Sequence, residues 1–120
     1  MAMLPDDLYN HVEHRIRTNM PDIAKAEYRL RRAKSKSEQK AIGAELAELD
    51  VWKACIDKVT KRFAGQMEAD VARIIWPEAR SMDEAAAELF AVRQTIRRCK
   101  ERFVTHVAVE ALKEGLVKDV

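Results

Sequence analysis

Residues 82–103, with the sequence MDEAAAELFAVRQTIRRCKERF, decide the fold because they lack glycine and proline and fit two different arrangements. As one helix, they place apolar residues at alternating spacings of three and four, which is the pattern of a heptad seam. The residues of this seam are Met82, Ala85, Leu89, Val92, Ile96, Cys99 and Phe103. As two helices, they form a short acidic helix, a corner near Phe90 and Ala91, and a basic helix. The first arrangement predicts a helical interaction protein and the second a DNA-binding protein.

The whole chain has the composition of one small domain. Its 120 residues are 35% charged with a formal net charge of +2, so the overall charge indicates no particular partner. No run approaches the roughly 18 apolar residues of a membrane span, and we expect a cytoplasmic protein without a membrane partner. Only three glycines and three prolines occur, and no alternating pattern is bounded by turn residues, so β-sheet is not expected.

Start and stop signals divide the rest of the chain into helices. Pro21 predicts a break and restart, because proline is tolerated at the first position of a helix but not inside it. Ser35 with Glu38, and Ser81 with Glu84, have the spacing of a capping box at a helix start. The helices expected before the stretch quoted above cover residues 6–18, 21–34, 37–64 and 67–76.

Residues that carry catalysis or bind metals are not arranged in any recognisable motif. Cys55 and Cys99 lie within apolar patterns, far apart in the sequence, which predicts buried reduced thiols. His11 and His14 are three residues apart, but no third ligand follows at a metal-site spacing. We therefore expect no enzyme, no catalytic residue, no metal and no cofactor.

Residues 68–104, EADVARIIWPEARSMDEAAAELFAVRQTIRRCKERFV, resemble region four of primary sigma factors and the helix-turn-helix of phage late-transcription regulators of the RinA and ArpU type. In those families, an apolar helix ending in an aromatic residue precedes the pattern hydrophobic-Glu-Glu-Ile-Ala, then Leu-Gly-Val-Ser-Arg, then Val-Arg. This chain has MDEAA, LFAVR and IR in the same order and spacing. Phe90 stands in place of the glycine and Val92 in place of the serine that caps the second helix. The small core of such a motif needs Ala86 at the helix crossing, with Leu89 and Ile96 as aliphatic anchors.

The resemblance implies that a second helix begins near Val92 and that its exposed early face meets the major groove of DNA. The residues of this face are Arg93, Gln94, Arg97 and Arg98. Arginine can pair with guanine and glutamine with adenine through two hydrogen bonds each. Lys100 and Arg102 lie further along, where they are expected to contact phosphates. The alternative is a solvated helix face whose charges are balanced by Glu88 and Glu101.

A second basic segment, residues 29–36, lies at the junction of the helices expected at 21–34 and 37–64. It is interpreted as a solvated loop, a clamp on DNA phosphates, or a contact to RNA. Residues 1–64 are expected to form an N-terminal helical scaffold or dimerisation region, and residues 65–120 a DNA-binding helix-turn-helix region. The predicted fold is all-α, a multi-helix bundle with a C-terminal helix-turn-helix.

Two functions follow from these patterns. The first is sequence-specific binding of double-stranded DNA by a transcription regulator, which the resemblance indicates to be phage or prophage encoded. RNA polymerase and a second copy of the chain are its further candidate partners. The second is a small helical protein-interaction factor, an inhibitor or assembly protein, in which residues 37–76 and 82–112 pair as an antiparallel hairpin. The shape of the molecule distinguishes them: an elongated hairpin, or a bundle with a corner at Phe90 and Ala91.

Overall fold

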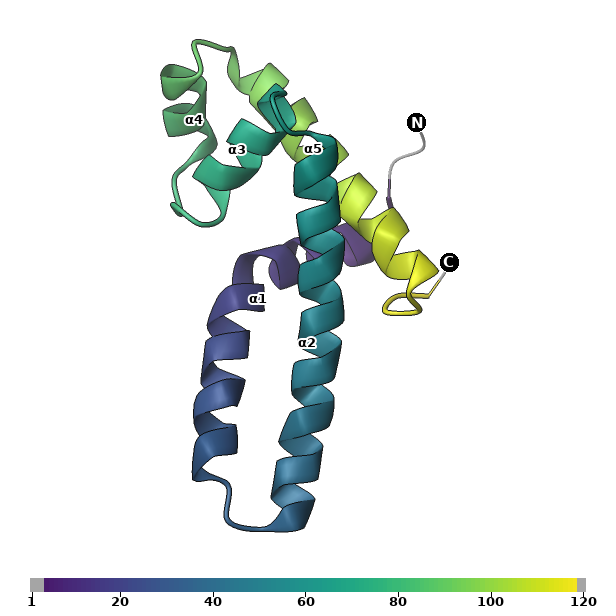
Figure 1. Ribbon diagram of the computed structural model, residues 1–120. Coiled ribbons are helices and arrows are strands. Elements are labelled where there is room, and N and C mark those ends of the chain that lie inside the picture. Colours follow the sequence, from purple (N-terminus) through teal and green to yellow (C-terminus); the bar gives the residue numbers. More distant parts are fainter. Residues whose placement is uncertain (1–3, 119–120) are drawn as a thin grey trace.

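The computed structural model describes residues 4–118, which form helices joined by turns, with no strand among them (Figure 1). The helices are α1 (Asp6–Arg32), α2 (Lys36–Arg62), α3 (Met67–Ile75), α4 (Met82–Glu88) and α5 (Arg93–Lys113). The prediction of an all-α protein is confirmed. None of these helices combines the length and the apolar character that crossing a membrane requires. The molecule is elongated, with extents of 52 × 31 × 24 Å.

Helix α1 continues through Pro21, where the sequence predicted a break, so that prediction was wrong. Figure 1 shows that α1 is bent partway along its length, as expected for a proline that lacks an N–H donor. The helix continues because both sides of the proline are held by α2. Asn19 is buried and donates a hydrogen bond from Nδ2 to the carbonyl of Leu49 at 3.0 Å, and Ile23 and Ala26 are buried in the core between α1 and α2.

Helices α1 and α2 form a long antiparallel hairpin (Figure 1). The predicted cap at its turn is present, because Ser35 Oγ accepts a hydrogen bond from the backbone N–H of Glu38 at 3.1 Å. Ile42 and Leu49 on α2 are buried against the apolar face of α1. The antiparallel partner of α2 is therefore α1, and not residues 82–112.

The largest core lies where α1, α2, α3 and α5 meet. Its centre is aromatic: Trp52, Phe63, Trp76 and Phe103 are each at most 6% exposed. Phe103 lies between two of the others, with ring centroids 5.5 Å from Trp76 and 6.3 Å from Phe63. This core contains residues that precede position 64 and residues that follow it, so the two halves of the chain are packed together.

Residues 82–103 are two helices, α4 and the start of α5, joined by a turn over residues 89–92 that we call the corner. The predicted bend is therefore present. Val92, which a continuous seam would bury, is 68% exposed. A second, smaller core lies between α3, α4 and α5 and contains Val71, Ile74, Ala85, Ile96 and Cys99. These three helices thus form a unit with an apolar centre of its own, at the end of the molecule opposite the α1–α2 turn (Figure 1).

Candidate nucleic-acid interface

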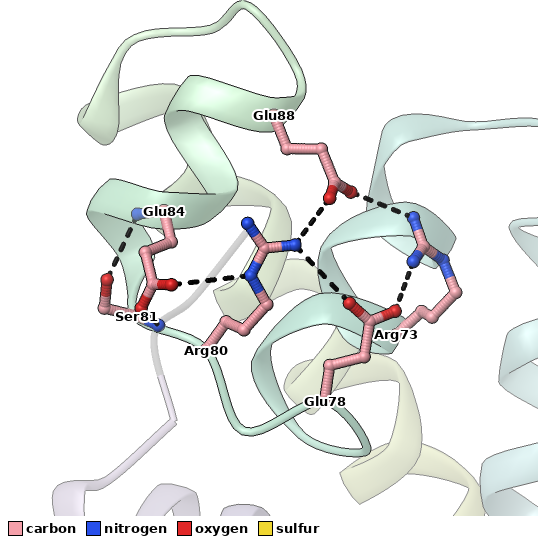
Figure 2. A network of polar contacts seen from close by, with 6 residues as sticks. All are labelled: Arg73, Glu78, Arg80, Ser81, Glu84 and Glu88. Atoms are coloured by element: carbon pink, nitrogen blue, oxygen red, sulfur yellow. Dashed lines mark hydrogen bonds and ion pairs between the residues drawn. The ribbon is translucent and has the colours of Figure 1, made fainter.

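A network of ion pairs fixes α4 against α3 (Figure 2). Glu88 on α4 accepts hydrogen bonds from Arg80, in the preceding loop, and from Arg73 on α3, the latter at 3.3 Å. Arg73 also donates to Glu78 in the same loop. Arg80 additionally pairs with Glu84 at 3.5 Å. Because all five side chains are engaged with one another, α4 has a defined position from which the chain turns into α5.

The start of α4 is closed by the predicted capping box. Ser81 Oγ accepts a hydrogen bond from the backbone N–H of Glu84 at 3.1 Å, and the Glu84 carboxylate accepts one from the backbone N–H of Ser81 at 3.2 Å. The bond donated by the Ser81 backbone N–H lowers the pKa of the Glu84 carboxyl below its ordinary value. The prediction made from the Ser81 and Glu84 spacing is confirmed in full, whereas Ser35 and Glu38 show only the serine half of the same motif.

Acid should weaken the contact between α3 and α4. Hydrogen bonds from Arg80 and Arg73 hold the pKa of Glu88 below its ordinary value of 4.5. A carboxylate with a lowered pKa in the folded state stabilises the fold above its unfolded pKa, and that stability is lost as the pH falls through the folded pKa. We therefore expect the free energy of unfolding to decrease as the pH falls below the ordinary pKa of 4.5, and Glu88→Gln to reduce this dependence. Denaturant titrations across this range measure both.

Glu48→Gln is the matched control for the effect of Glu88→Gln on the pH dependence of stability. Glu48 is exposed on α2 and has no ion pair within residues 4–118. It should follow the pH curve of the unmodified protein. A Glu88→Gln variant that also follows that curve would show that the network contributes nothing to the acid dependence.

The corner has the geometry of a helix C-cap that normally requires glycine. The N–H of Ala91 donates to the carbonyl of Ala86 at 3.0 Å, and the N–H of Phe90 donates to that of Ala87 at 3.4 Å, which is the Schellman pattern. Phe90 occupies the left-handed position with φ +52°, and its side chain is 98% exposed. A β-carbon is strained in this conformation. The fold therefore holds an unfavourable backbone at a residue whose side chain contacts almost nothing within the protein.

Phe90→Gly should raise the free energy of unfolding by about 1 kcal/mol, because glycine adopts positive φ without strain. A reciprocal control lies at the end of α5, where the same pair of bonds ends the helix with Gly115 at φ +75°. Gly115→Ala should lower stability by a similar amount, since only the backbone opposes the new β-carbon. Denaturant titration of both variants measures the two opposite changes. A destabilised Phe90→Gly variant would mean that the phenyl ring makes a contact that stabilises the fold.

Beyond the corner, α5 presents four side chains that we call the exposed face: Arg93, Gln94, Arg97 and Arg98. Arg93 lies 3.8 Å from Asp83, and Arg97 lies 3.2 Å from Glu101, in ion pairs exposed to solvent. Such pairs exchange readily with other partners because they are worth at most about 1 kcal/mol. Within residues 4–118, Arg98 has no ion pair and the Gln94 side chain has no hydrogen bond. The expected neutralisation by Glu88 does not occur, because Arg73 and Arg80 occupy that carboxylate.

The first turn of α5 adds to this positive character. Val92 provides no side-chain acceptor, and the first turn contains no acidic residue. The amide hydrogens that begin a helix lack partners within it and carry partial positive charge. The exposed face therefore combines side-chain and backbone donors at one place.

Lys100 and Arg102, expected to contact phosphates, point to other parts of the protein. Lys100 is 2.7 Å from Glu13 on α1, and its side chain is only 19% exposed. Arg102 is 2.9 Å from Glu68 on α3 and lies over the ring of Phe63. The structure thus does not bring these two cations together with the exposed face. More than half of the Arg102 side-chain surface is nevertheless exposed to solvent.

In the small core of α3, α4 and α5, the buried alanine is Ala85, one residue before the expected Ala86. Ala85 is fully buried at the crossing of α4 with α5, while Ala86 and Leu89 are partly buried at its edge. Ile96 is fully buried, as expected of an aliphatic anchor. The ion-pair network of Figure 2 was not predicted from the sequence, although acidic and basic residues alternate around Pro77.

The remaining candidate residues have structural roles. Cys55 and Cys99 are buried free thiols, and burial raises the pKa of both. His11 packs edge-on against Trp52 at 5.9 Å. In the part of the chain that the structure describes, no three histidine, cysteine, aspartate or glutamate side chains are grouped to hold a metal ion.

Comparisons of the chain with protein-family models, with curated proteins and with solved structures find no match. The function is therefore inferred from the arrangement of these side chains.

Proposed function

We propose that the chain is a sequence-specific DNA-binding transcription regulator that inserts the start of α5 into the major groove. The observation that carries this proposal is the exposed face, with its three arginines and one glutamine on the first two turns of α5. These side chains have the donors that pair with guanine and adenine edges in the major groove. Their solvent-exposed ion pairs leave them available to DNA.

The surrounding architecture supports the same proposal. A helix that reads bases must be held rigidly while its own first turns remain uncovered. The small core fixes the inner side of α5 through Ile96 and Cys99, and the Arg73, Arg80 and Glu88 contacts fix α4 beside it. The similarity of residues 68–104 to sigma region four favours a regulator of phage or prophage origin that acts with RNA polymerase.

A second candidate function is a protein-interaction factor, and one observation favours it. Phe90 and Val92, at the corner, are 98% and 68% exposed. Exposed large apolar side chains beside each other are a feature of protein–protein contacts. In this function the corner docks on a protein and the arginines contribute to a polar rim.

Selection of binding sites from random duplexes, at two salt concentrations, tests the proposal. A regulator should recover a consensus sequence, and its affinity for that sequence should exceed its affinity for scrambled DNA at both concentrations. Binding without a consensus, with affinity that decreases equally for all duplexes as salt rises, would leave only electrostatic attraction. Failure to bind any duplex would favour the protein-interaction factor.

A further inference from the structure

The turn of the α1–α2 hairpin carries the largest local charge of the molecule, on residues 29–40, which we call the basic tip. It contains six basic residues and one acidic residue, a local net charge of +5 in a chain whose net charge is +2. The rest of the chain therefore sums to −3, so the charge is concentrated at this end. Figure 1 shows that the tip lies at the opposite end of the molecule from α4 and the corner.

The charges of the basic tip are free to meet a partner. All six basic side chains are exposed. Only Arg29 has an ion pair within residues 4–118, with Glu45 on α2. The other five basic side chains have no ion pair within residues 4–118, and their mutual repulsion lowers stability unless an anionic partner is present.

The tip is also a fixed surface. The turn is closed by the N–H of Ala33, which donates to the carbonyl of Leu30 at 3.2 Å, and by Gln39 Nε2, which donates to the carbonyl of Ala33 at 3.3 Å. Arg32 lies over the ring of Tyr28 at 4.9 Å. A turn whose backbone is already ordered loses little backbone conformational entropy when it binds.

We propose that the basic tip is a second nucleic-acid surface, which binds the phosphate backbone of a DNA duplex without reading its sequence. Evenly spaced phosphates are the anionic partner that suits several exposed cations on a convex surface. A membrane suits it less, because the basic tip lacks the large exposed apolar side chains that insert into lipid, and Tyr28 at its border is the nearest one. This proposal does not depend on the exposed face of α5.

A pair of substitutions at the tip, Arg31→Gln with Lys34→Gln, tests the proposal against a scrambled duplex. Because each phosphate contact contributes about 0.9 to the dependence of log affinity on log salt, the slope should decrease by up to about 1.8. Affinity at about 0.1 M salt should fall at least about tenfold. The control pair, Lys61→Gln with Lys118→Gln, removes two exposed charges from other parts of the chain and should change affinity by less than about twofold.

A charge-preserving variant and a lipid-binding assay complete the test. The charge-preserving pair Arg31→Lys with Lys34→Arg should restore both the affinity and the slope. Equal losses for the tip pair and the control pair would overturn the proposal, as would binding to anionic lipid vesicles in the absence of binding to the duplex. Since the duplex is scrambled, a failure of base reading by α5 leaves the expected result for the tip unchanged.

Discussion

Phe103→Ala should lower the free energy of unfolding by about 3 to 5 kcal/mol, the range for truncation of a buried aromatic side chain. Phe103 is 1% exposed and contacts both Trp76 and Phe63, so its removal empties the centre of the largest core. A domain of this size has a total stability of about 5 to 15 kcal/mol, and the variant should therefore be close to unfolding under mild conditions. Denaturant titration monitored by tryptophan fluorescence measures the change.

The matched control is Val109→Ala on the same helix, where the side chain is 44% exposed. It should change stability by less than about 0.5 kcal/mol. A loss below about 1 kcal/mol for Phe103→Ala would mean that the core closes around the missing ring, and that the aromatic contacts do not hold α5 in place.

The corner shows how far local sequence determines this fold. Ser81 and Glu84 predicted the start of α4 correctly, because a capping box is complete within four residues. The end of α4 had no such signal, since Phe90 replaces the expected glycine. The bend is determined by packing instead: it brings Ala85 on α4 into the same core as Ile96 and Cys99 on α5, whereas a continuous helix would separate Ala85 from Ile96 by about 16 Å along its axis.

Pro21 shows the reverse case, in which a strong local signal is overridden. Proline disfavours a helix interior by about 3 kcal/mol, yet α1 passes through it because contacts distant in sequence hold both sides. The bond from Asn19 to Leu49 spans thirty residues, and no local pattern identifies it. The same reason explains why Lys100 could not be assigned from sequence, since its partner Glu13 is on another helix.

The arginines of α5 were identified from sequence because their exposure follows from helical periodicity once the buried residues are known. Ile96, Cys99 and Phe103 define the inner side of the helix, and this leaves Arg97 and Arg98 on the outer side. The sequence could not show which carboxylates would neutralise them. Glu88 was a candidate, and the structure assigns it to Arg73 and Arg80.

The contrast between base reading and general attraction is best tested at Arg97. If Arg97 forms two hydrogen bonds with a guanine, Arg97→Ala should weaken binding to the preferred site by about 1 to 3 kcal/mol and relax the preference at one base pair. Binding to a scrambled duplex should change much less. Lys61→Ala removes the same charge from α2 and serves as the control.

Arg102 and Lys100 should behave differently from Arg97. If Arg102 leaves Glu68 for a phosphate, Arg102→Ala should weaken binding to all duplexes alike and reduce the salt slope by about one. Lys100→Ala distinguishes a phosphate-contacting role of Lys100 from a role in stabilising the fold. A phosphate contact would reduce the slope in the same way, whereas the ion pair with Glu13 at 2.7 Å predicts lower stability and an unchanged slope.

Together these variants separate a reading helix from a basic surface. A surface that merely attracts DNA would make Arg97→Ala, Arg102→Ala and Lys61→Ala equivalent on both the preferred and the scrambled duplex, because each removes one charge. If α5 reads bases, only Arg97→Ala should weaken binding to the preferred site more than it weakens binding to the scrambled duplex. Since Arg97 is two-thirds exposed and its only ion pair within residues 4–118 is with Glu101, its replacement should leave the fold intact. Equal losses on both duplexes for Arg97→Ala would therefore remove the base-reading role itself, and could not be attributed to unfolding.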